Sequence, residues 1–198
     1  MWRSVVILLV LAASPSARGQ DAVRVLVEGR VAAERAHLVR VGAWGGTALL
    51  SGAALLLASD REQLGRRAFG MQTAAWGAVN VAIAGVALAR GGDAATLDLA
   101  TALAREDRLG DLLWLNMGLN VGYVAVGTTL YAVGARAAVA RPDAWRGHGA
   151  AVVVQGLGLL VLDGLALAGG AGREGALREL VGTVSVVPGG ALSVTVPL

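Results

Sequence analysis

The sequence contains no cysteine and no lysine, and its only histidines are His37 and His148. Without cysteine the chain has no disulfide, no thiolate nucleophile, no cysteine-ligated zinc or iron–sulfur cluster and no lipid-modified N-terminal cysteine. Two histidines are too few for a multi-histidine metal centre. Charged residues make up 16% of the chain and hydrophobic residues 56%, whereas a soluble domain has about 25% charged residues. The composition therefore favours a lipid environment, and we expect no cofactor and no metal.

The first nineteen residues have the order of a secretory signal peptide. Arg3 provides a basic start, residues 5–13 are apolar, and small residues lead to Gly19, after which cleavage is expected. The apolar run is too short to span a bilayer, and an uncleaved anchor is the alternative. Cleavage leaves 15 arginines against 14 acidic residues. A mature chain so close to neutrality predicts no binding to nucleic acid.

Four later stretches carry almost no charge: residues 41–59, 68–89, 112–135 and 147–170, the last of which contains Asp163. A helix rises 1.5 Å per residue, so each stretch is long enough to cross a hydrocarbon core about 30 Å thick. The stretches lack the alternation of barrel strands. A soluble bundle is the alternative, but it needs a polar face on every helix. The sequence therefore predicts an all-α membrane protein, a four-transmembrane-helix bundle.

Arginine is concentrated in two of the connecting loops. Loops 60–67 and 136–146 carry three arginines each, whereas residues 90–111 combine three arginines with five acids. The positive-inside rule then places the two arginine-rich loops in the cytoplasm. The mature N- and C-termini are expected on the periplasmic or outer side of a bacterial inner membrane, although four arginines in residues 21–40 argue against this orientation.

The segments that flank the spans are expected to lie outside the membrane. Residues 21–40 mix apolar and charged side chains, and they either extend the first span as a helix or lie along the membrane surface. Residues 173–198 form an extracytoplasmic tail whose two β-favouring stretches, around residues 188–190, predict a short hairpin. The expected organisation is a signal peptide (1–19), a four-helix transmembrane domain (20–172) and this tail.

Polar side chains form one stripe on each of three spans. At 100° per residue and a rise of 1.5 Å, Asn80, Asn120 and Asp163 fall at similar depths near the midplane. An aspartate in the centre of a membrane helix costs about 2.5–3.5 kcal/mol, so it should face a partner inside the bundle. We predict that these three residues meet there, and that Tyr123 and Gln155 complete the network. The alternative is that the polar groups only hold the helices together, each hydrogen bond contributing about 0.6 kcal/mol.

Two further patterns concern helix packing. Gly42 and Gly46, like Gly118 and Gly122, are four residues apart, a spacing that allows close approach between helices of one chain. The pair Trp44-Gly45 recurs as Trp76-Gly77 in the next span, which either marks a duplicated helix or arises by chance.

Three segments in this order resemble a family of uncharacterised bacterial four-helix membrane proteins, classed as a domain of unknown function. The segments are Gly70–Asn80, Leu119–Gly127 and Val154–Asp163. The resemblance covers about residues 30–170. It implies the architecture and no activity.

Motifs of the common enzyme classes are absent. The sequence has no phosphate-binding loop, no dinucleotide fingerprint, no His-Glu-x-x-His and no Gly-x-Ser-x-Gly, and a single acid within the spans cannot form an aspartyl-protease pair. We therefore expect no enzyme but a small polytopic inner-membrane protein with a structural or partner-binding role. Its expected partners are the lipid bilayer and either another membrane protein or a second copy. The alternative is a carrier or proton-coupled transporter with an intramembrane polar site around Asp163.

Overall fold

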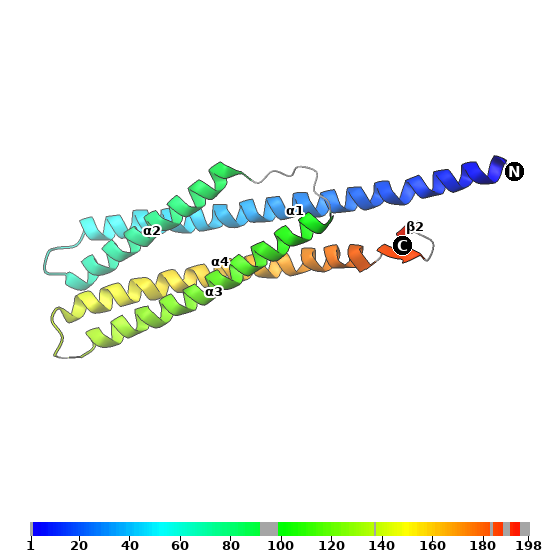
Figure 1. Ribbon diagram of the computed structural model, residues 1–198. Coiled ribbons are helices and arrows are strands. Elements are labelled where there is room, and N and C mark those ends of the chain that lie inside the picture. The colour runs from blue at the N-terminus through cyan, green and yellow to red at the C-terminus, as the bar shows by residue number, and fades with distance from the viewer. Residues whose placement is uncertain (1, 92–98, 137, 183, 188–190, 195–198) are drawn as a thin grey trace. The chain divides into compact units, whose positions relative to one another are not determined.

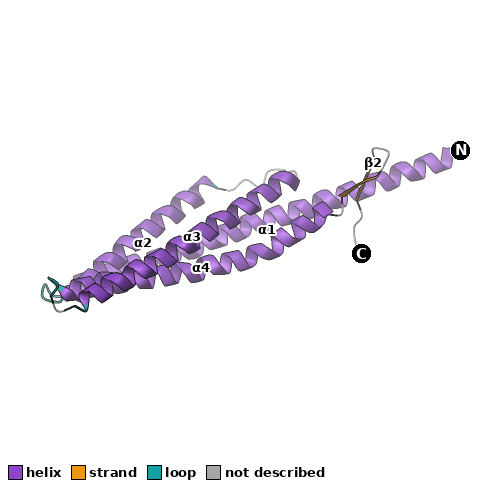
Figure 2. Ribbon diagram, turned by 60° about the horizontal axis from the view of Figure 1, so that its bottom comes forward, coloured by secondary structure: helices purple, strands orange, loops and turns teal. Residues whose placement is uncertain are grey.

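The computed structural model describes residues 2–91, 99–136, 138–182, 184–187 and 191–194. Helices account for most of this length (Figure 1), and Figure 2 separates them by colour from the strands and loops. The elements are α1 (Trp2–Leu57), α2 (Leu64–Arg90), α3 (Leu99–Gly134), α4 (Pro142–Gly182), β1 (Val184–Val187) and β2 (Ala191–Val194).

The ends of the helices have local causes in the sequence. α4 begins at Pro142, because proline fixes a helical φ and lacks only an N–H that the first turn would leave unpaired. α2 ends before Gly91, which has a φ of 63° that glycine adopts without strain. At the end of α1, the Arg67 guanidinium donates hydrogen bonds to the carbonyls of Leu56 and Ser59. These bonds satisfy carbonyl groups that the last turn leaves free.

Three helices of the described residues are long and apolar enough to cross a membrane. They are Arg24–Leu57, Leu64–Arg90 and Pro142–Ala176. The first begins well before the expected limit of residue 41, because α1 continues without a break through residues 21–40. Of the two readings of that segment, the helical extension of the span is therefore the one that the structure supports.

α3 is not among these three helices, so the expectation of four spans is met for three by length and composition. The physical reason lies in the uncharged stretch 112–135, which carries more polar side chains than the other spans. They are Asn116, Asn120, Tyr123, Thr128, Thr129 and Tyr131. These residues lower the mean hydropathy of a segment that is otherwise long enough.

The C-terminal end is more helical than the sequence suggested. α4 continues to Gly182, beyond the expected limit of the transmembrane domain at residue 172. After it, β1 and β2 pair antiparallel, with Val184 opposite Val194 and Val187 opposite Ala191. The expected turn at residues 188–190 lies outside the described residues.

The chain divides into two compact units, the larger of which contains all five residues of the predicted polar cluster. This unit consists of residues 34–91 and 111–167, and the smaller unit of residues 1–33, 92–110 and 168–198. The larger unit is built from two helical hairpins, α1 with α2 and α3 with α4. Figures 1 and 2 show the turns of both hairpins at the same end.

In the first hairpin α1 and α2 approach backbone to backbone through four glycines. Gly45 and Gly52 are seven residues apart on α1, and they face Gly77 and Gly70 of α2. A methyl group at Gly52 would lie 2.6 Å from the Gly70 carbonyl oxygen, and one at Gly77 would lie 2.6 Å from that of Gly45. Only glycine permits this contact, because real side-chain carbons do not approach backbone atoms so closely.

The second hairpin has one such pair of facing glycines, Gly127 with Gly149, whereas Gly134 faces Pro142 and Arg146 and Gly156 faces Asn120 and Val124. Gly127 and Gly134 are seven residues apart on α3, and Gly149 and Gly156 are seven apart on α4. A methyl group at Gly127 would lie 2.7 Å from the carbonyl oxygen of Gly149. Close backbone contact at glycines seven residues apart therefore recurs in both hairpins.

The expected role of glycines four residues apart is wrong in three of four cases. Gly46, Gly118 and Gly122 have open space where a side chain would stand, and Gly42 makes an ordinary contact with Ala84. The close approach of helices uses the spacing of seven. This spacing returns to nearly the same face after two turns of an α-helix.

The larger unit has small residues inside and large apolar residues outside. Ala48, Ala84 and Ala151 are buried, whereas Leu57 is 87% and Val161 62% exposed. So many exposed large apolar side chains around a core of this size would be unfavourable in a water-soluble protein. The pattern is compatible with helices surrounded by lipid.

Candidate functional site

Asp163 of α4 lies inside the larger unit, with only 3% of its surface exposed. Its Oδ2 accepts a hydrogen bond of 2.8 Å from the Nδ2 of Asn120 on α3. Its Oδ1 lies 3.3 Å from the Nε2 of His37 on α1. Both oxygens of this carboxylate are therefore engaged by side chains of two other helices.

The glycine spacing explains why Asn120 and Asp163 meet. Asn120 lies seven residues before Gly127, and Asp163 lies seven residues after Gly156. Each polar side chain thus continues the face along which α3 and α4 make their closest contact.

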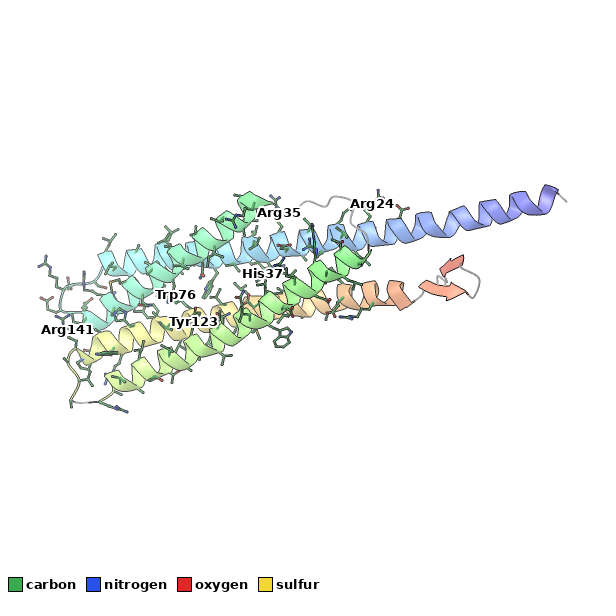
Figure 3. The ribbon with its side chains drawn as sticks, viewed as in Figure 1. Arg24, Arg35, His37, Trp76, Tyr123 and Arg141 are labelled. Atoms are coloured by element: carbon green, nitrogen blue, oxygen red, sulfur yellow. The ribbon has the colours of Figure 1, made fainter. Side chains whose placement is uncertain are left out.

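His37 contributes the one imidazole of this site and is itself buried (Figure 3). Its Nδ1 is buried and has no hydrogen-bond partner among the described residues. A neutral ring with its proton on Nε2 can donate to Asp163, whereas an imidazolium forms an ion pair with it. Either form leaves a polar ring atom unpaired in the interior.

A second contact between α1 and α4 lies about two turns away. The indole Nε1 of Trp44 donates a hydrogen bond of 2.9 Å to the Oε1 of Gln155. The indole ring packs over Gly158, where a side chain would overlap it. Since His37 and Trp44 are seven residues apart, both lie on the same face of α1 and hold α4 at two levels.

Asn80 and Tyr123 do not join this network. Asn80 is buried against Gly45, and its Nδ2 has no hydrogen-bond partner among the described residues. The Tyr123 ring lies beside that of Trp76, with centroids 4.9 Å apart and planes at 57° (Figure 3). The predicted five-residue cluster is therefore divided: Asn120 and Asp163 are bonded, Gln155 bonds to Trp44, and Asn80 and Tyr123 make separate contacts.

Sequence reasoning missed His37 and Trp44, the two residues of α1 at the site. His37 precedes the uncharged stretch that begins at Val41, although the helix starts far upstream. The spacing of seven between His37 and Trp44 was the available signal, since it places both on the face that also carries buried Val41 and Ala48.

The smaller unit has a separate group of charged residues. Glu106 of α3 is buried and accepts a hydrogen bond of 2.9 Å from the Nη2 of Arg173 on α4. Arg178 lies 2.7 Å from Glu174 and 3.4 Å from Asp107. The adjacent Glu174 carboxylate raises the pKa of Arg178, so the guanidinium of Arg178 stays charged.

The chemistry available at the Asp163 site is limited to hydrogen bonding and proton exchange. Among the described residues, no group of three histidine, aspartate or glutamate side chains is placed to hold a metal ion. The site offers one carboxylate, one imidazole and two amides, with the nucleophilic side chains serine and threonine absent from these contacts. Such groups can fasten helices or carry a proton.

These features define a predominantly helical protein whose apolar helices and buried polar contacts are compatible with a membrane. The chain belongs to a family of unknown function (DUF6992), which matches residues 40–164. The expected resemblance to an uncharacterised family is thus confirmed. The matched segment includes nearly all of both hairpins and Asp163, and begins three residues after His37. No curated protein and no solved structure matches the chain.

Proposed function

We propose that this protein is a polytopic protein of the bacterial inner membrane, delivered by a signal peptide, whose four helices provide a rigid scaffold for a membrane partner or a second copy. The observation that carries the structural role is the occupation of both Asp163 oxygens by side chains of α1 and α3. A carboxylate held in this way joins three helices, and with only 3% of its surface exposed Asp163 is hardly accessible to a ligand. The role requires no catalysis.

The fourth span of this proposal is α3, and its surface supports the assignment. Its outward side chains include Trp114, Leu115 and Val126, all more than half exposed. The hydroxyls of Thr128 and Thr129 donate to backbone carbonyls four residues earlier on the same helix. Those bonds satisfy the hydroxyls without water. This is needed inside a bilayer, because lipid chains offer no hydrogen-bond partner.

The topology can be tested because the chain has no cysteine. Single cysteines in place of Asp60 and Ser185 should react from opposite sides with a reagent that cannot cross the membrane. We expect labelling of Ser185→Cys in intact spheroplasts and labelling of Asp60→Cys only after lysis. Labelling of both in intact spheroplasts would contradict the four-span arrangement.

The role of Asp163 can be tested with a pair of substitutions. Asp163→Asn keeps the shape and can bond to both neighbours, so a scaffold should keep its thermal stability and any co-purified partner. Asp163→Ala leaves His37 and Asn120 unpaired and should lower the free energy of unfolding by about 2 kcal/mol. Equal stability of Asp163→Ala and wild type would contradict the fastening role.

One observation favours the second candidate, a proton-coupled carrier. The buried Nδ1 of His37, without a partner among the described residues, adjoins a carboxylate that can exchange a proton with the same ring. For a carrier, proteoliposomes with an enclosed pH-sensitive dye should lose an imposed pH gradient faster than protein-free liposomes. Asp163→Asn should abolish the difference while the protein stays folded. If the protein is a scaffold, proteoliposomes with wild type and with Asp163→Asn should lose the pH gradient at the same slow rate.

A further inference from the structure

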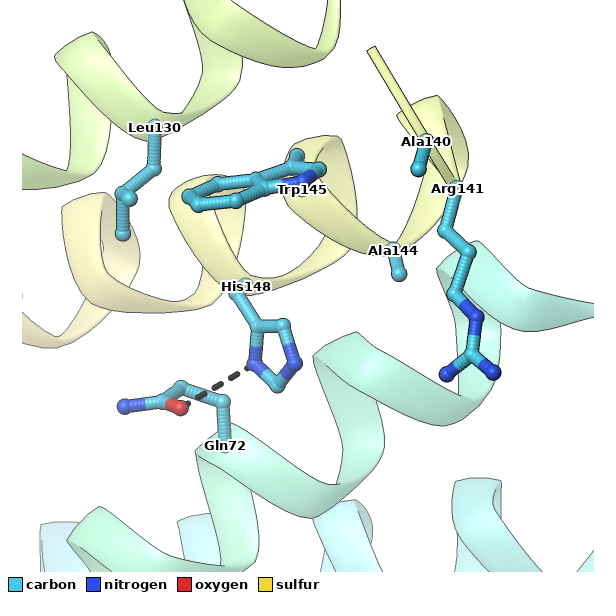
Figure 4. A pocket seen from close by; sticks show the side chains of 7 residues that line it. All are labelled: Gln72, Leu130, Ala140, Arg141, Ala144, Trp145 and His148. Carbon is cyan, nitrogen blue, oxygen red and sulfur yellow. Dashed lines mark hydrogen bonds between the residues drawn. The ribbon is translucent and has the colours of Figure 1, made fainter.

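The turn end of the larger unit contains a pocket of about 380 Å³. Its polar lining comes from Gln72, Arg141 and His148, and its apolar lining from Leu130, Ala140, Ala144 and Trp145. Figure 4 shows Leu130 and Arg141 at opposite ends of the pocket, with Trp145 and His148 between them. A cavity that is cationic at one end and apolar at the other matches an amphiphile with an anionic head.

Arg141 is the charged group available to a ligand. It forms no ion pair within the described part of the chain, whereas the nearby acid Asp143 lies 3.6 Å from Arg146. The backbone of Arg141 has a φ of 55°, which is unusual for a residue with a side chain. Such a conformation is strained, and strained residues of this kind cluster at binding sites.

His148 adds a second polar group. Its Nδ1 lies 3.1 Å from the Oε1 of Gln72. In this arrangement Nδ1 donates the hydrogen bond, and Nε2 is left without a hydrogen bond to any described residue. An imidazolium Nε2–H can donate to a phosphate oxygen, as can the Arg141 guanidinium.

The position of the pocket selects the ligand class. It lies at the first two turns of α4, where the candidate span begins, and Trp145 is partly exposed there, as is typical of the membrane interface. The two loop segments at this end, residues 58–67 and 135–146, contain six arginines and three acidic residues. Basic pockets between helices at this level bind anionic headgroups.

We propose that this pocket binds one anionic phospholipid, with its phosphate at Arg141 and His148 and an acyl chain along Trp145 and Leu130. This site is separate from the Asp163 contacts. It rests on the proposed membrane insertion of α4, because the apolar half of the pocket would otherwise have no acyl chain to receive. A free phosphate would use the polar half alone.

Native mass spectrometry of the detergent-solubilised full chain tests the proposal. We expect one phosphatidylglycerol to remain bound at least about tenfold more tightly than phosphatidylcholine. Arg141→Asn should reduce the preference about tenfold, because asparagine accepts a positive φ and removes only the charge. Arg136→Asn, on the same loop outside the pocket, is the matched control and should leave the preference intact.

Two further measurements test whether the phosphate belongs to a lipid and where the acyl chain of that lipid lies. Inorganic phosphate alone should neither bind nor displace the lipid, and displacement by it would replace the lipid proposal with a free-phosphate site. Phosphatidylglycerol with brominated chains should quench tryptophan fluorescence more in wild type than in Trp145→Phe.

The outcomes that overturn the proposal are equal binding of the two lipids, or equal effects of Arg141→Asn and Arg136→Asn. Unchanged thermal stability of Arg141→Asn without lipid shows that the variant is folded. Extraction of the protein from membranes by alkaline carbonate would show instead that the membrane assignment itself has failed.

Discussion

The two hairpins of the larger unit are both packed through glycines, but they differ in the residues that lie next to the glycine contact. Both bring glycines seven residues apart into backbone contact with the next helix: two pairs of glycines face each other in the first hairpin, and one pair, Gly127 with Gly149, does so in the second. Seven residues beyond the glycines, on the same helix faces, the first hairpin has Leu38 and Ala84. The second hairpin has Asn120 and Asp163 at the corresponding positions. The glycines therefore set the distance between the helices, and the residues beyond them decide whether the interface is apolar or polar.

This difference teaches that the polar pair is not needed to close a hairpin. α1 and α2 pack closely with an apolar pair at that position. The polar pair of the second hairpin instead reaches a third helix, since Asp163 also contacts His37 of α1. Its structural effect is to connect the hairpins.

The largest expected effect comes from breaking the glycine contact. In Gly77→Ala the new methyl would meet the backbone of Gly45 and Leu49, neither of which can rotate away. We expect a loss of about 3 kcal/mol in the free energy of unfolding, measured by denaturation in mixed micelles. Gly156→Ala should cost about 1 kcal/mol, because the nearest atom is a methyl of Val124 that can move and the Asn120 carbonyl oxygen, at 3.0 Å, needs to shift only slightly. Gly122→Ala, into open space, is the control; a comparable loss there would refute the packing argument.

The next effect comes from giving the second hairpin the residues of the first. Asp163→Ala should destabilise by about 2 kcal/mol, because two buried polar side chains lose their partner. The double variant Asn120→Leu/Asp163→Ala should recover about 1 kcal/mol of this loss, since it removes one of those groups. Thermal unfolding of the single and double variants in the same detergent measures both values. No recovery in the double variant would show that the Asn120 contact carries little energy.

A smaller effect is expected at the contact between Trp44 and Gln155, which also joins the two hairpins. Trp44→Phe removes the donor to Gln155 and keeps most of the ring that covers Gly158. A double-mutant cycle with Gln155→Leu should give a coupling energy of about 0.6 kcal/mol. Additive effects of the two substitutions would mean that the hydrogen bond does not connect the hairpins.

The smallest effect is expected for the hydroxyl of Tyr123. Tyr123→Phe keeps the ring contact with Trp76 and should change the unfolding midpoint by an amount equivalent to less than about 0.5 kcal/mol. Tyr123→Ala removes the ring contact and should cost about 1 kcal/mol more. A large loss in Tyr123→Phe would restore the residue to the polar network that the sequence suggested.

Charge and periodicity were sufficient to predict the helices and the meeting of Asn120 with Asp163, because both depend on local rise and rotation along a helix. They were not sufficient for His37 and Trp44, whose roles depend on which face of α1 meets α4. The separation of Asn80 from the cluster has the same cause: it lies at similar depth, but on the face that packs against Gly45. Depth can be read from the sequence, whereas the pairing of helix faces is a tertiary property.

The backbone contacts within each hairpin have a mechanical consequence. Where main chain rests on main chain with no side chain between, neither helix can slide or roll by one residue without driving a β-carbon into its neighbour. We therefore expect each hairpin to move as a rigid body, and any internal motion of the larger unit to occur along the interface where Trp44 and His37 contact α4.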